Sequence, residues 1–137
     1  MEADHALVRE AHEKFYAALL AVCSGNPEPM TDSWVHDDHV TTAHPMGPWI
    51  IGWGAIEATW REFAHAISNP TQRISALEIR LFGDTAYTLC VEHWKLTMLG
   101  KEVEFSSNAT NVYRKTPAGW RIVHHHADKA PSFEAAI

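Results

Sequence analysis

The sequence predicts an α+β fold in which helices cover one face of a curved antiparallel sheet. The first observation is a change of hydrophobic period, because apolar residues recur every three to four positions before Pro70 and every two positions after it. The second is that the later segments are joined by only two to four residues, as in antiparallel hairpins. The third is that two amphipathic helical segments come before the four long strands.

The helical part begins with residues 3–23. Phe15 and Leu19 belong to an apolar stripe at helical spacing, and the prolines at positions 27 and 29 cannot continue the helix. The next predicted elements are a short helix over 31–35, a hairpin of strands 39–44 and 49–51 around the turn 45–48, and a helix over 54–67 that ends at Asn69-Pro70.

The second half of the chain is predicted to be sheet. Four segments show alternating polarity and are separated by turn residues. They span residues 72–82, 85–99, 102–115 and 120–128. The length of 137 residues predicts one domain over 1–137.

Composition excludes several classes of function. The formal net charge of −6 argues against a nucleic-acid partner, which needs a basic face. No apolar run is long enough to span a bilayer, so no membrane partner is expected. The first ten residues lack a signal-peptide pattern and the two cysteines suit a reducing compartment, so we expect a cytoplasmic location.

Three motifs resemble one known superfamily. Thr42–Gly47, followed by Gly52–Ile56, is similar to the hairpin-then-helix signature of ketosteroid isomerases and SnoaL-like proteins. Thr110–Lys115 leads through a turn into Trp120–His126, as in the last two strands of the calcium/calmodulin-dependent kinase association domain. His44-Pro45 with Gly52 and Ala58-Thr59-Trp60 resembles a bacterial SnoaL-like subgroup of no assigned activity. The chain is therefore identified as resembling the SnoaL-like, nuclear transport factor 2-like superfamily over nearly its whole length.

This resemblance implies a cone-shaped fold. About four long strands and a short hairpin form the sheet, which the N-terminal and middle helices wrap around a deep apolar pocket. The outer sheet face is often a dimer interface in the superfamily, so a homodimer through the sheet is expected. The fold hosts isomerases, dehydratases, cyclases and non-catalytic modules, so function depends on the pocket residues.

His44 is the first candidate catalytic residue. It stands where ketosteroid isomerases carry a catalytic aspartate, just before a Pro-x-Gly turn. A neutral imidazole can abstract a proton beside a carbonyl at neutral pH. The alternative is a buried histidine that only holds the turn.

Glu92 and His125 are the next candidates. Strand alternation, in the register of the kinase association domain, points Glu92 into the pocket, where a buried carboxylate needs a partner. His125 or Arg114 could be that partner, and a Glu92–His125 dyad could move the proton. The alternative is an ion pair on the outer face of the sheet.

Asn111 and Tyr16 complete the candidate catalytic set. Loose alignment puts Asn111 near the second oxyanion-hole group of ketosteroid isomerases, and Tyr16 near the phenolic donor of the family. Either side chain could instead be packed in the core. The residues predicted to line the pocket are Trp49, Trp94, Phe105, Ser107 and Tyr113.

The run of three histidines suggests a weaker alternative. His124 and His126 share one strand face and His125 takes the other. The first two could chelate a metal with His93 or His39, but no cysteine pair or HExxH motif accompanies them. We therefore expect no metal and no cofactor, with the pair on the outer face.

Two functions follow from these residues. The first is a cofactor-independent acid/base enzyme, an isomerase, dehydratase or cyclase, that acts on a small hydrophobic carbonyl compound. The second is a non-catalytic ligand-binding or oligomerisation module. Asn111 and Ala127 stand where the kinase association domain carries arginines, which weakens the assembly version and any acidic ligand.

Overall fold

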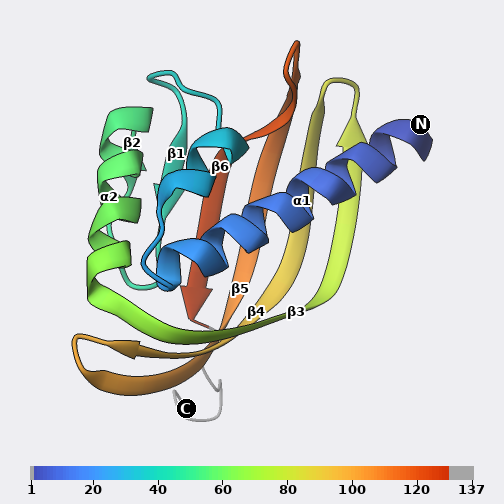
Figure 1. The fold of residues 1–137 in the computed structure, drawn as a ribbon. Coiled ribbons are helices and arrows are strands. Elements are labelled where there is room, and N and C mark those ends of the chain that lie inside the picture. The colour runs from blue at the N-terminus through green and yellow to red at the C-terminus, as the bar shows by residue number, and fades with distance from the viewer. Residues whose placement is uncertain (1, 130–137) are drawn as a thin grey trace.

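One six-stranded sheet with two helices on its concave face makes up the described part of the chain, residues 2–129 of this computed structural model (Figure 1). The predicted α+β class and its curved sheet are confirmed. In chain order the elements are α1 (Glu2–Cys23), the 3-10 helix η1 (Glu28–Ser33), β1 (Thr41–Ala43), β2 (Ile50–Ile51), α2 (Trp53–Ala66), β3 (Ile67–Phe82), β4 (Thr85–Met98), β5 (Lys101–Thr116) and β6 (Gly119–Lys129).

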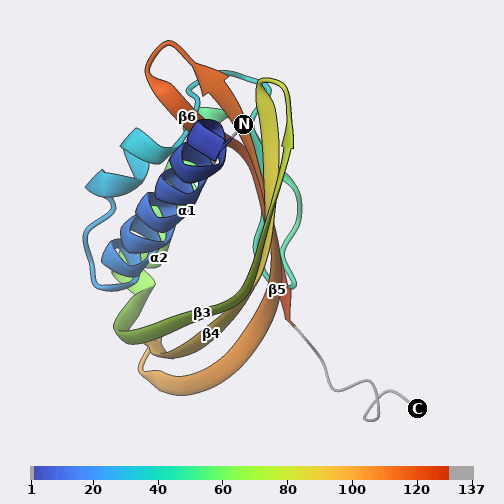
Figure 2. The same ribbon diagram turned by 90° about the vertical axis from the view of Figure 1, so that its right-hand side faces the viewer.

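The short hairpin extends the main sheet. The strand order is β2-β1-β6-β5-β4-β3, and all neighbours are antiparallel except β1 and β6, which run parallel. Thr42 of β1 pairs with His125 of β6, and its hydroxyl donates to the His125 carbonyl oxygen at 2.7 Å. The sheet therefore has six strands rather than four, because the predicted short hairpin joins the four long strands in one sheet. The side view shows the long strands bending beneath the helices (Figure 2).

Helix α1 packs against the concave face of the sheet. Its buried side chains recur every three or four residues, and Val8, Phe15 and Val22 are fully buried. The Phe15 ring lies at the centre, with its centroid 6.4 Å from that of Trp60 and 4.9 Å from that of His125. One aromatic side chain thus joins α1, α2 and β6.

The boundary between α2 and β3 differs from the prediction. The helix ends at Ala66 and the strand begins at once, so Pro70 lies inside β3 rather than at the end of the helix. The pairing register shifts between Ser68 and Thr71, and Asn69 has a φ of 51°. Because β3 is an edge strand with a bulge here, the missing N–H of Pro70 removes no needed ladder bond.

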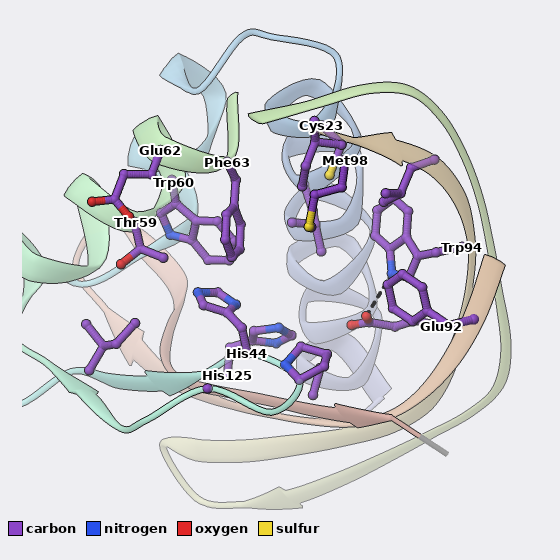
Figure 3. Close-up of a pocket in the computed structure, with 18 of the residues that line it drawn as sticks. Cys23, His44, Thr59, Trp60, Glu62, Phe63, Glu92, Trp94, Met98 and His125 are labelled. Carbon is purple, nitrogen blue, oxygen red and sulfur yellow. Dashed lines mark hydrogen bonds between the residues drawn. The ribbon is translucent and has the colours of Figure 1, made fainter. Parts of the chain in front are cut away.

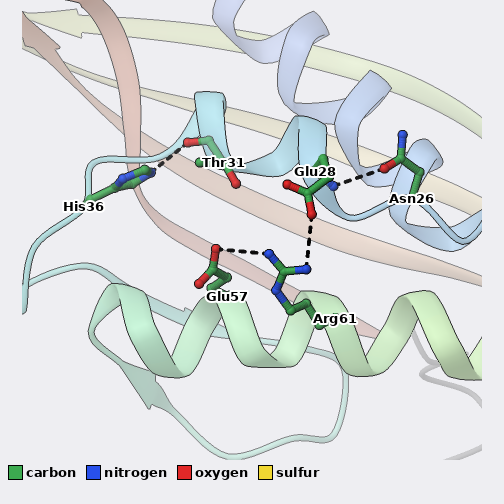
Figure 4. A network of polar contacts seen from close by, with 6 residues as sticks. All are labelled: Asn26, Glu28, Thr31, His36, Glu57 and Arg61. Atoms are coloured by element: carbon green, nitrogen blue, oxygen red, sulfur yellow. Dashed lines mark hydrogen bonds and ion pairs between the residues drawn. The ribbon is translucent and has the colours of Figure 1, made fainter.

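A surface network ties α2 to the segment after α1 (Figure 4). Arg61 of α2 pairs with Glu28 at 3.2 Å and with Glu57 at 3.6 Å. These ion pairs are solvent-exposed, so each contributes less than about 1 kcal/mol.

The predicted helix over 31–35 is here the 3-10 helix η1, which follows Pro27. No helix in residues 2–129 is long and apolar enough to cross a membrane.

We predict that Phe15→Ala lowers the free energy of unfolding by about 3–5 kcal/mol, because it opens a cavity where three elements meet. Leu7→Ala is the matched control on the same helix, since Leu7 is 46% exposed, and it should cost less than about 1 kcal/mol. Urea unfolding followed by circular dichroism measures both values. Equal losses in the two variants would contradict the central place of Phe15.

Candidate functional site

A cavity of about 510 Å³ lies between the two helices and the concave face of the sheet (Figure 3). Most of its wall is apolar. The histidines His44 and His125 lie close together on one side, and Glu92 lies on the opposite side with Trp94. The cavity therefore has two polar ends separated by aromatic and aliphatic surface.

A tight turn positions His44 immediately after β1. The Gly47 N–H donates to the His44 carbonyl oxygen at 2.8 Å, and Met46 within the turn has a φ of 63°. A Cβ added to Gly47 would lie 3.3 Å from that same oxygen. The close backbone approach favours glycine at this position and holds the His44 ring at the cavity wall.

The His44 ring is surrounded by aromatic side chains. Its centroid lies 4.8 Å from that of Trp60 and 4.6 Å from that of Phe63. Its Nε2 is buried and has no hydrogen-bond partner among the described residues. Burial lowers the pKa of His44 to about 4, so the imidazole is neutral at pH 7.

The second cavity histidine, His125, is anchored from behind. It is 2% exposed, and its Nδ1 forms a short hydrogen bond with Asn111 Oδ1. Burial first, and then the proximity of His44, lower its pKa well below the ordinary value. The two ring centroids are 6.2 Å apart, which disfavours charge on both rings at once.

Glu92 is a buried carboxylate held by neutral donors. Tyr16 donates its hydroxyl proton to Oε2 at 2.7 Å, and Trp94 Nε1–H donates to Oε1 at 3.0 Å. Neither predicted partner makes this contact, since His125 bonds to Asn111 and Arg114 pairs with Asp37. Burial raises the pKa of Glu92, and the two hydrogen bonds partly oppose that shift.

These contacts form one chain of hydrogen bonds with a single direction. The Tyr16 hydroxyl uses its one hydrogen to donate a hydrogen bond to Glu92. It can therefore only accept the hydrogen bond from the Asn111 amide, at 3.1 Å. The Asn111 oxygen is then the acceptor, and His125 Nδ1 must carry the proton. The remaining lone pair of the neutral ring is on His125 Nε2.

The candidate residues joined by these hydrogen bonds differ in their position relative to the cavity. His44, Glu92 and His125 line it, whereas Asn111 and Tyr16 lie behind its wall with their donors engaged. In this structure Asn111 and Tyr16 therefore do not face the cavity, unlike the expected oxyanion donors. Their place in the structure is the link between His125 and Glu92.

One buried histidine beside this chain of hydrogen bonds was not predicted from the sequence. His12 is 3% exposed, and its Nδ1 lies 3.2 Å from Thr88 Oγ1, which also accepts weakly from Asn111. The signal was its position one helical turn before Tyr16 on α1, on the same buried stripe.

The predicted lining residues divide into two groups. Trp94 and Phe105 line the cavity. Ser107 and Tyr113 are buried on the inner side of the sheet but do not line it. Trp49 is 60% exposed and does not line it, so that prediction is wrong. Its ring lies against His126 at 5.0 Å instead, because the β1–β2 turn carries it to the outer side of β6.

The remaining histidines lie away from the cavity. His124 bonds to Thr41 Oγ1 at 2.7 Å, and the His124 and His126 ring centroids are 6.3 Å apart. His93 is held between the hydroxyls of Ser75 and Ser106. Residues 2–129 contain no group of three or more histidine, cysteine or acidic side chains placed to hold a metal ion.

Solved structures share this architecture. A candidate dehydratase of the NTF2-like family from Streptomyces avermitilis is 25% identical, with a TM-score of 0.82 over 96% of this chain and 99% of that chain. A candidate calcium/calmodulin-dependent protein kinase type II association domain from Thiobacillus denitrificans is 32% identical, with a TM-score of 0.71 over 88% and 93% of the two chains. An NTF2-like superfamily protein from Salmonella enterica is 20% identical, with a TM-score of 0.83 over 96% and 94%.

Sequence comparison gives the same assignment. No curated protein matches the chain. The model of the SnoaL-like domain matches residues 8–129, which include all six strands and most of α1. The protein therefore belongs to the SnoaL-like domain family and has the cone-shaped fold of the NTF2-like superfamily.

Proposed function

We propose that the protein binds a small, largely apolar carbonyl compound in its cavity and catalyses proton transfer next to the carbonyl group. The observation that carries this proposal is the directed chain of hydrogen bonds that leaves a lone pair on Nε2 of His125, a residue of the cavity wall. A neutral imidazole with one nitrogen anchored and the other free has the form of a general base.

The reaction begins with removal of a proton from the carbon beside the carbonyl. His125 Nε2 accepts that proton, and the electron pair of the broken C–H bond moves into an enolate. The positive charge on the ring strengthens its Nδ1–H bond to Asn111. The Glu92 carboxylate at the far end of the chain then balances the charge through neutral groups.

His44 supplies the complementary hydrogen bond. Its Nε2 is buried without a hydrogen-bond partner, so a turn of the ring that brings this nitrogen to a ligand oxygen breaks no hydrogen bond of Nε2. In the tautomer that carries hydrogen on Nε2, the ring donates to the developing enolate oxygen. Return of the proton to a different carbon, or loss of a leaving group, gives isomerisation or dehydration without a cofactor. The alternative is that the same cavity binds its ligand and leaves it unchanged.

We predict that the protein accelerates deuterium uptake by 2-indanone in D₂O, followed by proton NMR. A working general base should give about 10²–10⁴-fold over buffer. His125→Gln should return the rate to background, because the base is lost. His44→Gln should lower it by at least about tenfold, because the enolate loses a hydrogen bond.

The matched control is His5→Gln, since His5 is exposed near the start of α1. This variant should keep the full rate. Exchange at the wild-type rate in His125→Gln would contradict the assigned base, and a wild-type rate equal to buffer would favour the binding-only alternative.

We predict that His44 makes the stability of the protein depend on pH. The folded protein keeps this ring neutral down to about pH 4, whereas the unfolded chain takes up a proton near pH 6.5. The stabilisation is present above about pH 6.5 and is lost as the pH falls toward about 4. Between about pH 7.5 and 5.0, the wild type should lose on the order of 1–2 kcal/mol more than His44→Gln in urea unfolding.

A comparison between variants is needed because burial raises the pKa of Glu92, and that shift acts in the opposite direction. His5→Gln is again the control and should follow the wild type. Identical pH dependence in His44→Gln and the wild type would show that this ring is not held neutral.

A second candidate function is self-association through the outer sheet face. Trp49 is exposed there beside His124 and His126, and a kinase-type association domain is 32% identical to this chain. We predict a homodimer in light scattering after gel filtration, and a shift to monomer in Trp49→Ser because a large apolar contact is lost. Met46→Ser is the control, since Met46 is 89% exposed in the turn. A monomeric wild type would contradict this candidate.

A further inference from the structure

The cavity contains acidic side chains and no basic side chain to balance them. Glu92 and Glu62 both contribute to its wall, and no lysine or arginine from residues 2–129 lines it. Figure 3 places the two carboxylates on different sides of the space. The histidines of the cavity are neutral at pH 7, so no cation of the cavity wall offsets the ionised form of Glu92, and that form presents a negative field to whatever enters.

Of the two carboxylates, Glu92 interacts more strongly with a charged group in the cavity, because it is buried whereas Glu62 is exposed. It is 3% exposed, and the ion pairs of residues 2–129 do not include it. Each of its oxygens accepts from one neutral donor, whereas a carboxylate can accept about four hydrogen bonds. A buried carboxylate without a cation is costly, so a positive group that enters the cavity gains a strong partner.

The negative field reaches the facing helix. Cys23 of α1 also lines the cavity, and burial followed by the charge of Glu92 raises the pKa of its thiol to about 12. An anionic ligand group would meet the same two penalties that disfavour the thiolate, burial first and then repulsion by Glu92. Carboxylates and phosphates are therefore poor ligands for this space.

Aromatic rings supply the rest of a cation-binding surface. Trp94 and Phe105 are cross-strand partners on β4 and β5 and line the Glu92 end of the cavity. Trp60 and Phe63 of α2 line the opposite wall. Ring faces attract cations, and they do so most strongly where water is excluded.

We propose that the ligand is a compact apolar molecule that carries a protonated amine, and that this amine lies against Glu92. The inference rests on the proposed function, in which the same molecule presents its carbonyl group to His125 and His44. It deepens that function by naming the ligand class as an apolar amino-carbonyl compound with its two polar groups at opposite ends of the cavity.

Three rigid probes of one shape test the charge preference. They are 2-aminoindane, 2-indanol and indane-2-carboxylate, which are cationic, neutral and anionic at about pH 7.5. Quenching of tryptophan fluorescence reports binding, because Trp60 and Trp94 line the cavity. We expect the amine to bind about tenfold more tightly than the alcohol, and the carboxylate at least about tenfold more weakly than the alcohol.

The Glu92→Gln variant identifies the group responsible. It should bring the amine to within about threefold of the alcohol while the affinity for the alcohol stays the same. Glu10→Gln removes the same charge from the exposed face of α1 and should keep the wild-type preference. If Glu92→Gln fails to fold, the wild-type ranking of the amine above the alcohol and the carboxylate still decides the question.

Several results would overturn the inference. Equal binding of the amine and the alcohol would do so, as would tighter binding of the alcohol or carboxylate, or an amine preference that persists in Glu92→Gln. Catalysed exchange of 2-indanone without an amine preference would overturn this inference alone. Exchange at the buffer rate together with an amine preference would overturn the catalytic proposal and support the ligand class. Absence of both would overturn both.

Discussion

A buried carboxylate that only neutral groups contact constrains how four elements of this protein meet. Glu92 of β4 needs the hydroxyl of Tyr16 on α1, which in turn needs the amide of Asn111 on β5, which needs the ring of His125 on β6. Each polar atom left without its partner would be costly in the dry interior. The strand register and the depth of α1 in the cone are therefore set together, since Asn111 and His125 are directly paired residues of adjacent strands.

This constraint gives the cavity its two chemically different ends. At one end the neutral His125 and His44 meet, and at the other a carboxylate faces aromatic rings. The wall between them is mostly apolar, and a low local dielectric strengthens electrostatic contacts. In the proposed function, acid/base chemistry and charge selection would have one source, because Glu92 would orient the base through the hydrogen-bond chain and present its own charge to the ligand.

Alternation along the strands predicted which residues share a face of the sheet, and the resemblance to the kinase association domain predicted that Glu92 turns inward. The wider family resemblance singled out His44. Sequence reasoning of this kind had its limits. It could not supply the partners of Glu92, because side-chain contacts between α1 and the sheet depend on the depth of the helix. Alternation also failed for Trp49, because this residue lies in the turn just before the two-residue strand β2. The place of Pro70 inside β3 depended on a bulge, which leaves no sign in a period-two pattern.

The parallel contact between β1 and β6 affects when, during folding, His44 and His125 come together. Thr42 and His125 are 83 positions apart in the chain, yet their strands are neighbours. Contacts of such long range carry a large loop-closure cost and form late in folding. During synthesis β6 must emerge from the ribosome before the rings of His44 and His125 can lie side by side. A chain that ends before β6 lacks His125, the partner of His44, and also the strand that joins β1 and β2 to the rest of the sheet.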